Sequence, residues 1–370
     1  MVNISAYVPI LQAKAAEIGA LTQLPQLNEV LAPMLEVPAI RYDTRKQEYD
    51  HPLDTQVQRI AGHLTSAKSW PSTWYLDVPP APPRGRRSKK PGYDARLADG
   101  RHALHSLMTS CRAYGKTPIA VLALDRDRDY VAAVRACAAH DHRGVCLRLN
   151  ADEVDDTNAI AELLDAVAVT AGDVDVVLDL GAVTDGSITI FADGLTASLQ
   201  RLAKNSRWRS VTIAGGSFPQ SLSGYEDGSH LITRSEYAIW RRICANLPTS
   251  LPAPRFGDYG IQAPGQREMN ARAAKAMSAN VRYTLEHDWL VVRGGNIKEG
   301  IGHEEYRDVC KVVRGHEQFC GASFSPGDSA FEACARGHGK PGTPKSWRQH
   351  GTSHHLAFVS RQIATSLAGS

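Results

Sequence analysis

Eight short apolar runs recur along the chain, and segments with a helical pattern separate them. The runs are AYVPIL (6–11), LAPMLEVP (31–38), TWYLDVP (73–79), PIAVLALD (118–125), GVCLRLN (144–150), VDVVLDLG (174–181), SVTIAGG (210–216) and RFGDYG (255–260). Strands that alternate with helices pair in parallel, and eight such units predict an α/β fold of the closed (β/α)8, TIM-like barrel type. An open doubly wound sheet is the alternative, but the first run lacks the phosphate-binding glycine turn usual in that fold.

The side chains within these runs alternate as a closed barrel requires. In VDVVLDL, Val176 and Leu178 share one face, whereas Asp175 and Asp179 share the other. LAPMLEV, TWYLDV and VCLRL alternate in the same way. One face suits contact with surrounding helices, and the other carries a charged residue near the C-terminal end of the strand. Barrel enzymes build their sites at that end, so the pattern predicts a polar site at the barrel mouth.

Two insertions and a tail extend the predicted barrel. A basic loop at 79–94 follows the third run, and residues 279–296 are predicted to form a β-hairpin. A helix at 303–313 is expected to complete the eighth helical layer. We therefore expect a barrel over 1–320 and a helical C-terminal extension over 321–370. The insertions and the tail all start from the mouth side, so we expect the extension to pack over the mouth.

Composition sets the broad class of the protein. The chain has 370 residues, of which 43% are hydrophobic and 22% charged, as in ordinary globular proteins. A net charge of +3 does not by itself indicate a nucleic-acid partner. The seven cysteines include no CxxC pair, which favours free thiols in a reducing compartment. We see no signal peptide and no apolar stretch near the roughly 20 residues that span a bilayer, so we expect a cytoplasmic protein without a membrane partner.

Charged residues gather at the predicted strand ends. The set comprises Glu36, Asp77, Asp125, Arg148, Asp179 and Asp258. Because eight strand ends converge at a barrel mouth, we expect these side chains to lie together. Buried ionised groups are costly unless they are paired or hydrated. Two interpretations remain open: a ligand site in which Glu36, Asp77 and Asp179 supply acid–base or metal chemistry, and a self-compensated salt-bridge layer that plugs the mouth.

The sequence leaves the cofactor unknown. Several carboxylates at strand ends are compatible with a divalent metal such as magnesium or calcium. No HExxH motif occurs, so zinc is not indicated. Arg148 among the acids suits an anion or a salt bridge as well as a metal neighbour.

Other residues near the strand ends have both a functional and a simpler interpretation. Lys14 can meet a phosphate, Asp258 and Tyr259 lie between two glycines, and Arg293 before Gly-Gly suits an anion clamp. The simpler interpretations are a solvated lysine, a turn and an edge-strand charge. Five cations in RGRRSKK (84–90) are able to attract nucleic acid, but no aromatic residue interleaves with them, which favours a solvated loop.

The motif WRQHGTSHHL lies close to the C-terminus. Thr352 or Ser353 is expected to cap a helix, which places His354 and His355 in its first turn, where exposed N–H groups favour an anion. Histidine also transfers protons, and adjacent helical residues diverge, so one of the pair is expected to face a site. With Arg348, the pair is expected to form a lid over the strand-end charges. The simpler interpretation is a buried capping histidine.

Seven motifs occur in a characteristic order along nearly the whole chain. They are YVPILQAKAAEIGAL, PMLEVP, VVLDLG, FGDYG, WLVVRGG, FSPGD and WRQHGTSHHL. In this order they resemble the beta-protein family, which is named for a protein of satellite phages. The resemblance implies the product of an accessory cassette of a prophage or phage satellite, often tied to anti-phage defence or host killing. It implies no established reaction, so no residue roles follow from it.

Three functional hypotheses are compatible with the sequence. The first is a pocket enzyme or sensor for a phosphorylated, nucleotide-like ligand, held by Arg148, Arg293 and a tail histidine, with hydrolysis as an open step. The second is a non-catalytic immunity or regulatory subunit that binds a partner protein of its own cassette. The third is nucleic-acid binding through the loop at 84–90.

Overall fold

Eight parallel strands close into a barrel in the order β1-β11-β9-β8-β7-β6-β5-β2. The computed structural model describes residues 7–38, 42–43, 48–49, 53–67, 69–79, 96–265 and 277–368. The barrel strands are β1 (Tyr7–Gln12), β2 (Met34–Glu36), β5 (Tyr75–Asp77), β6 (Ile119–Leu122), β7 (Val145–Asn150), β8 (Val174–Ala182), β9 (Ser210–Gly216) and β11 (Arg255–Asp258). Each coincides with a predicted run, so the (β/α)8 prediction is confirmed.

Helices and short turns connect the strands. The helices are α1 (Ala15–Thr22), α2 (Leu53–Ser66), α3 (Ala103–Ala113), α4 (Arg128–Asp141), α5 (Thr157–Val167), α6 (Ile188–Asn205) and α7 (Ser235–Asn246). Shorter elements are η1 (Pro25–Leu27), η2 (Ala171–Asp173), η3 (Asp185–Ser187), η4 (Gly302–Glu304) and the two-stranded ribbon of β3 (Tyr42–Asp43) and β4 (Glu48–Tyr49). Polar caps start several helices: the side chains of Asp127 and Asp156 accept backbone N–H bonds at the first turns of α4 and α5.

The predicted alternation places two apolar layers on the two sides of the barrel wall. Outward residues such as Val176 and Leu178 join the helices in the main hydrophobic core. Inward residues such as Val121 and Val177 form a smaller core inside the barrel. Toward the C-terminal ends of the strands, the inward-facing residues become polar. This change from apolar to polar along one face positions the mouth residues described below.

A three-stranded module stands beside the barrel. It contains β10 (Gly228–Thr233), β12 (Ser278–Thr284), β13 (Asp288–Asn296), α9 (Glu305–Gly315) and α10 (Pro326–Ala335). The hairpin of β12 and β13 confirms the predicted insertion. β10 was not predicted, because it pairs with β13 across a long stretch of sequence. α9 packs its buried Tyr306, Val309 and Val313 with the sheet residues, so the prediction that it completes the barrel's helical layer is wrong.

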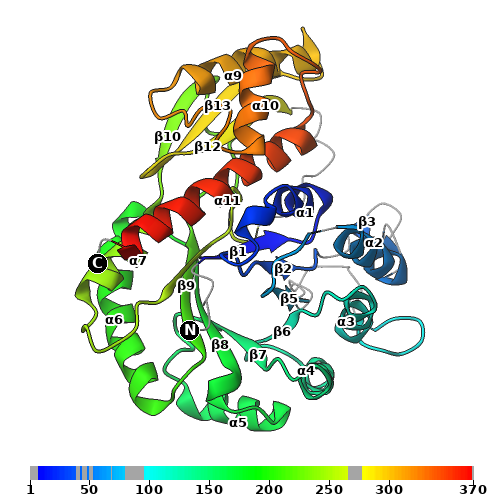
Figure 1. Ribbon diagram of the computed structural model, residues 1–370, viewed down its shortest axis with the longest axis vertical. Coiled ribbons are helices and arrows are strands. Elements are labelled where there is room, and N and C mark those ends of the chain that lie inside the picture. The colour runs from blue at the N-terminus through cyan, green and yellow to red at the C-terminus, as the bar shows by residue number, and fades with distance from the viewer. Residues whose placement is uncertain are drawn as a thin grey trace.

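Helix α11 (Pro344–Ala368) joins the module to the barrel. It contacts α1, α10 and β12, and the Ser366 hydroxyl lies 3.2 Å from that of Tyr237 in α7. Figure 1 shows α11 running between the module and the barrel. Leu356 and Val359 of α11 belong to the main barrel core, so this helix closes the helical ring between α7 and α1.

The start of α11 differs from the prediction. Thr343 accepts a hydrogen bond from the Ser346 amide at 3.2 Å, and Pro344 occupies the first helical position. Thr352 and Ser353 therefore lie buried in the middle of the helix, and the prediction that one of them caps it is wrong. The helix continues through WRQHGTSHHL because this segment packs against the barrel and the module. These contacts are long-range, so the local sequence does not predict them.

Several predictions concern parts of the chain that the contacts do not test. Residues 80–94 of the basic loop lie outside the described residues. The division of the chain at residue 320 stays a prediction. Among the described helices, none is both long and apolar enough to cross a bilayer.

Candidate functional site

Strand register brings three polar side chains to one level at the barrel mouth. Gln12 of β1 pairs with Glu36 of β2, and Glu36 pairs with Asp77 of β5. The Gln12 amide donates a hydrogen bond to Glu36 at 2.6 Å. Across the mouth, Asp179 of β8 accepts a bond from the Gly181 amide at 2.9 Å, which fixes its carboxylate. The strand ends therefore meet as the sequence predicts.

Arg148 of β7 is the centre of this group. Its Nη1 donates to Glu36 at 2.7 Å and to Asp77 at 2.8 Å, while its Nη2 donates to Asp179 at 2.7 Å. The Tyr259 hydroxyl accepts from Nη2 at 2.9 Å and donates to Asp179 at 2.5 Å. One guanidinium thus orders three carboxylates that would otherwise repel one another.

A second arginine, which the sequence reasoning missed, completes the group. Arg126 lies in the loop between β6 and α4, and its Nη2 donates to Oδ1 of Asp77 at 2.8 Å. Its side chain is only 4% exposed, whereas that of the neighbouring Asp125 is 58% exposed and lies outside the group. The run LALDRDR offered a signal, because Arg126 adjoins a strand end that was already under consideration. We call the set Glu36, Asp77, Arg126, Arg148, Asp179 and Tyr259 the mouth cluster.

The mouth cluster has one more acid than base. Its three carboxyl groups face two guanidinium groups, so one carboxyl is the natural place for a proton. Burial raises the pKa of Glu36, and the charges of Asp77 and Asp179 raise it further against the attraction of Arg148. A carboxyl with a raised pKa at a barrel mouth is a candidate acid or base.

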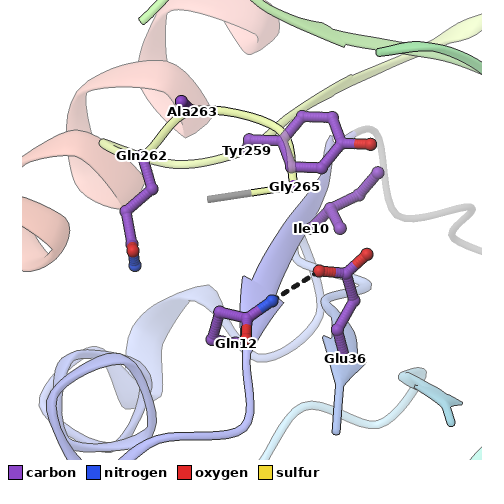
Figure 2. A pocket seen from close by; sticks show the side chains of 7 residues that line it. All are labelled: Ile10, Gln12, Glu36, Tyr259, Gln262, Ala263 and Gly265. Atoms are coloured by element: carbon purple, nitrogen blue, oxygen red, sulfur yellow. Dashed lines mark hydrogen bonds between the residues drawn. The ribbon is translucent and has the colours of Figure 1, made fainter. Parts of the chain in front are cut away.

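A small pocket opens beside Glu36. It is lined by Ile10, Gln12, Glu36, Tyr259, Gln262, Ala263 and Gly265. Figure 2 shows Glu36 and Gln12 on one side and the loop after β11 on the other. Glu36 and Tyr259 are the ionisable side chains of this lining. The pocket therefore gives access to Glu36, the carboxyl of the mouth cluster whose pKa burial raises.

The far side of Gln262 carries a surplus of positive charge. The Gln262 amide donates to Glu17, a fully buried carboxyl of α1. Burial raises the pKa of Glu17, and the charges of Arg348 and Lys14 act against that rise. Burial, and then the charge of Arg348, lower the pKa of Arg282 to about 9. The charges of Arg348 and Lys14 thus act on Glu17, and those of Arg348 and Glu17 act on Arg282, so this region behind Gln262 has a positive balance of charge.

Asp258 and His355 lie outside the barrel wall rather than in its mouth. Asp258 shares its strand face with Phe256, which packs against Trp240 of α7 at 5.6 Å between ring centres. His355 Nε2 lies 2.9 Å from Asp258 and 2.9 Å from the Tyr7 hydroxyl, and its Nδ1 lies 2.9 Å from Thr284. The alternation within RFGD contained this information, because Phe256 and Asp258 are two residues apart.

His354 is also enclosed. Its Nδ1 lies 2.9 Å from Asp328 of α10, its Nε2 lies 2.9 Å from the Thr284 carbonyl, and its ring stacks on Tyr283 at 3.7 Å. Both ring nitrogens therefore face oxygen atoms, so the hydrogen-bonding capacity of the ring is used within the protein. Both histidines are 0% exposed. We call Tyr7, Asp258, Tyr283, Thr284, Asp328, His354 and His355 the joint network, because they connect the barrel, the module and α11.

The fold and the order of motifs now have an independent comparison. A family model described as "Beta protein" matches residues 7–361, which is nearly the whole chain. The chain belongs to the beta protein family. The match covers the barrel, the module and most of α11, so the resemblance noted from the motifs is confirmed. Among curated proteins, no significant match to the chain is found.

The remaining predicted residues of this beta protein family member lie elsewhere. Arg293 of β13 donates to the carbonyls of Leu222 and Tyr225 and, at 3.0 Å, to Ser278. It therefore fixes the loop before β10 instead of facing the mouth cluster. Within the described residues, no group of three or more His, Cys, Asp or Glu side chains is arranged to hold a metal ion. In the mouth cluster, Arg148 occupies the space among the carboxylates that a cation would need.

Proposed function

We propose that this protein is a phage-associated accessory protein whose barrel mouth binds a small phosphorylated, nucleotide-like ligand. Membership of the beta protein family supports the accessory role. The observation that carries the ligand class is the pocket, whose wall includes Gln12, Glu36 and Gln262, together with the positive charges of Arg348 and Lys14 that act on Glu17 behind Gln262.

The two ends of the pocket suit two parts of one ligand. At one end, the Glu36 carboxyl and the Gln12 amide offer hydrogen-bond groups to a polar, base-like portion. At the other end, the charges of Arg348 and Arg282 act on each other and on a single buried carboxyl. A phosphate group there offsets the repulsion between the two guanidiniums, since arginine forms strong charge-assisted bonds with phosphate.

We assign proton transfer in this pocket to Glu36. Its raised pKa keeps a proton available, and it lines the pocket directly. Arg148 and Gln12 hold the carboxyl in one orientation, which a proton donor requires. The enclosed His354 and His355 have no part in this proposal. In this proposal Arg348 contacts the phosphate, since its charge already acts on the buried Glu17 that Gln262 contacts.

The test compares matched nucleosides and nucleoside monophosphates by thermal shift and calorimetry. We expect the phosphorylated member of a pair to stabilise the wild type, and Arg348→Met to weaken its binding at least tenfold without affecting the unphosphorylated member. Lys345→Met, at an exposed position of the same helix, is the control. Stabilisation by no phosphorylated ligand sinks the proposal. Phosphate release that stops in Glu36→Gln identifies an enzyme, and binding without release identifies a sensor.

A second candidate function rests on Arg148. Its guanidinium already compensates Glu36, Asp77 and Asp179, as a structural plug of the mouth would. This favours a non-catalytic immunity or regulatory subunit that binds a partner protein of its own cassette. Replacing Glu36 and Asp179 by alanine separates the two candidates. The measurement is the phage-associated phenotype of cells that carry the cassette. A phenotype that survives both replacements supports the partner-binding subunit, and a phenotype that is lost although the variant folds supports the ligand site.

A further inference from the structure

Arg126 holds donors that the described chain does not use. Its Nη2 bonds to Asp77 at 2.8 Å, and its Nε lies 3.6 Å from Asp125, beyond hydrogen-bond distance. Within the described part of the chain, Nε and Nη1 are buried and have no hydrogen-bond partner. A buried donor without an acceptor destabilises the fold, and more so when the group is charged, so a purely structural role does not explain these two donors.

The guanidinium is nevertheless held firmly in place. It lies 5.1 Å from the centre of the Tyr130 ring, whose hydroxyl donates to the Val121 carbonyl at 2.8 Å. The Asp77 bond fixes the other end of the group, since Asp77 is itself held by Arg148. A charged side chain that is 4% exposed, oriented on two sides and unsatisfied on a third is arranged to receive a ligand oxygen.

We propose that Arg126 forms an oxyanion-binding site at the β5–β6 side of the mouth, separate from the pocket beside Glu36. Its ligand is a phosphate group, as a free ion or as part of a larger molecule, whose oxygen accepts a hydrogen bond from Nη1 at the unpaired end of the guanidinium. The site does not depend on the proposed function, because the pocket is lined from β1, β2 and the loop after β11.

The charges around Arg126 define how the anion binds. Arg126 and Arg148 together face Asp77 between them, and the exposed Asp125 is screened by water. An anion at Arg126 competes with Asp77 for the same guanidinium. The hydrogen bond from Arg148 to Asp77 then becomes stronger. Because Nη1 of Arg148 also donates to Glu36, an anion at Arg126 weakens the bond between Arg148 and Glu36. The site is therefore linked to the pocket through the chain Arg126–Asp77–Arg148–Glu36.

Calorimetric titration with inorganic phosphate at constant ionic strength tests this site. We expect the wild type to bind phosphate and Arg126→Met to lose at least tenfold in affinity. Arg126→Lys keeps a positive charge for Asp77 but lacks Nη1, so it decides the question if the methionine variant does not fold. Arg201→Met, which removes an exposed arginine paired with Asp155, should bind phosphate as the wild type does.

The outcomes separate this site from the pocket. Phosphate binding that is lost in Arg126→Lys but kept in Arg348→Met supports the Arg126 site, whatever the fate of the pocket proposal. Equal phosphate affinity in wild type and Arg126→Lys overturns the inference, and so does a wild type that binds no phosphate. A nucleoside monophosphate that competes with inorganic phosphate identifies a phosphoryl group as the natural occupant, whereas independent binding identifies the free ion.

Discussion

The mouth cluster and the joint network are both built from buried charged groups, but they differ in what remains unused. In the joint network, both ring nitrogens of His354 and of His355 lie 2.9 Å from an oxygen, and both side chains are buried. In the mouth cluster, Glu36 borders a pocket, and Nε and Nη1 of Arg126 have no hydrogen-bond partner among the residues that the structure describes. The fully used hydrogen-bonding groups of the joint network favour a structural role, and the unpaired donors of the mouth cluster support the proposal that a ligand binds there.

The difference also appears in how each group balances its charge. The joint network pairs one enclosed histidine with Asp328 and leaves the other neutral beside Asp258. The mouth cluster holds three carboxyl groups against two guanidinium groups. A proton or an added cation would balance its remaining negative charge. Titratable groups that are not fully compensated are more often found at functional sites than in structural joints.

The largest expected effect comes from breaking the joint network at Asp328. Asp328→Ala removes the hydrogen-bond partner of Ser325, Tyr283 and His354 at once and leaves three buried polar groups without that partner. We expect a loss of about 4 kcal/mol in the free energy of unfolding, measured by urea denaturation. Asp308→Ala, at an exposed ion pair of α9, is the control and should leave stability unchanged. An unfolding free energy of Asp328→Ala equal to that of the wild type would contradict a structural role for the joint network.

Removing the central arginine of the mouth cluster should cost less, and the cost should depend on pH. Arg148→Met leaves three carboxyl groups without their shared partner, which we expect to destabilise the fold by about 3 kcal/mol at pH 8. Burial already raises the pKa of Glu36, and loss of the cation raises it more. A carboxyl with a raised folded-state pKa stabilises at low pH and loses that contribution as pH rises, so the defect should shrink toward pH 5. A defect of constant size between these pH values contradicts this account.

Acid sensitivity offers a milder comparison at His355. Burial lowers the pKa of His355 more than the nearby Asp258 raises it, so the folded state holds the neutral ring. The unfolded chain takes up the proton first as pH falls below about 6.5, and stability should fall with a slope of at most about 1.4 kcal/mol per pH unit. His355→Gln should lack this step in a plot of unfolding free energy against pH. His140→Gln, at a residue whose side chain is 69% exposed, should retain it.

The sequence predicted the barrel and most of the mouth cluster because both depend on local alternation. The inward-facing positions of the strands can be counted from the sequence, and the polar ones near the C-terminal ends are Glu36, Asp77, Arg148 and Asp179. The closed barrel then brings these strand ends together. Arg126 was missed because it lies one residue beyond the counted strand end. Its importance comes from a bond to Asp77, 49 residues away in the chain.

The joint network was harder to predict for the same physical reason. The partners of His354 and His355 lie 26 to 348 residues away, and no periodicity encodes such contacts. The tail therefore predicted a helix start with both histidines in its first turn, whereas the packed helix begins at Pro344. Saturation of a polar group is a tertiary property, so the sequence identified candidates for both regions but did not separate the functional from the structural ones.

The smallest expected effect tests how tightly the joint is packed. A Cβ at Gly351 of α11 would lie 2.9 Å from the Arg282 carbonyl oxygen and from the Ile261 side chain, whereas a Cβ at Gly62 of α2 meets nothing within 4 Å. Alanine favours a helix over glycine by about 1 kcal/mol at either position, but overpacking costs about 1–3 kcal/mol. Gly351→Ala should therefore lower the unfolding free energy by about 1 kcal/mol, and Gly62→Ala should raise it by a similar amount. If both substitutions stabilise, α11 has room to shift against β12, and the joint would be a movable contact that can transmit ligand binding at the mouth.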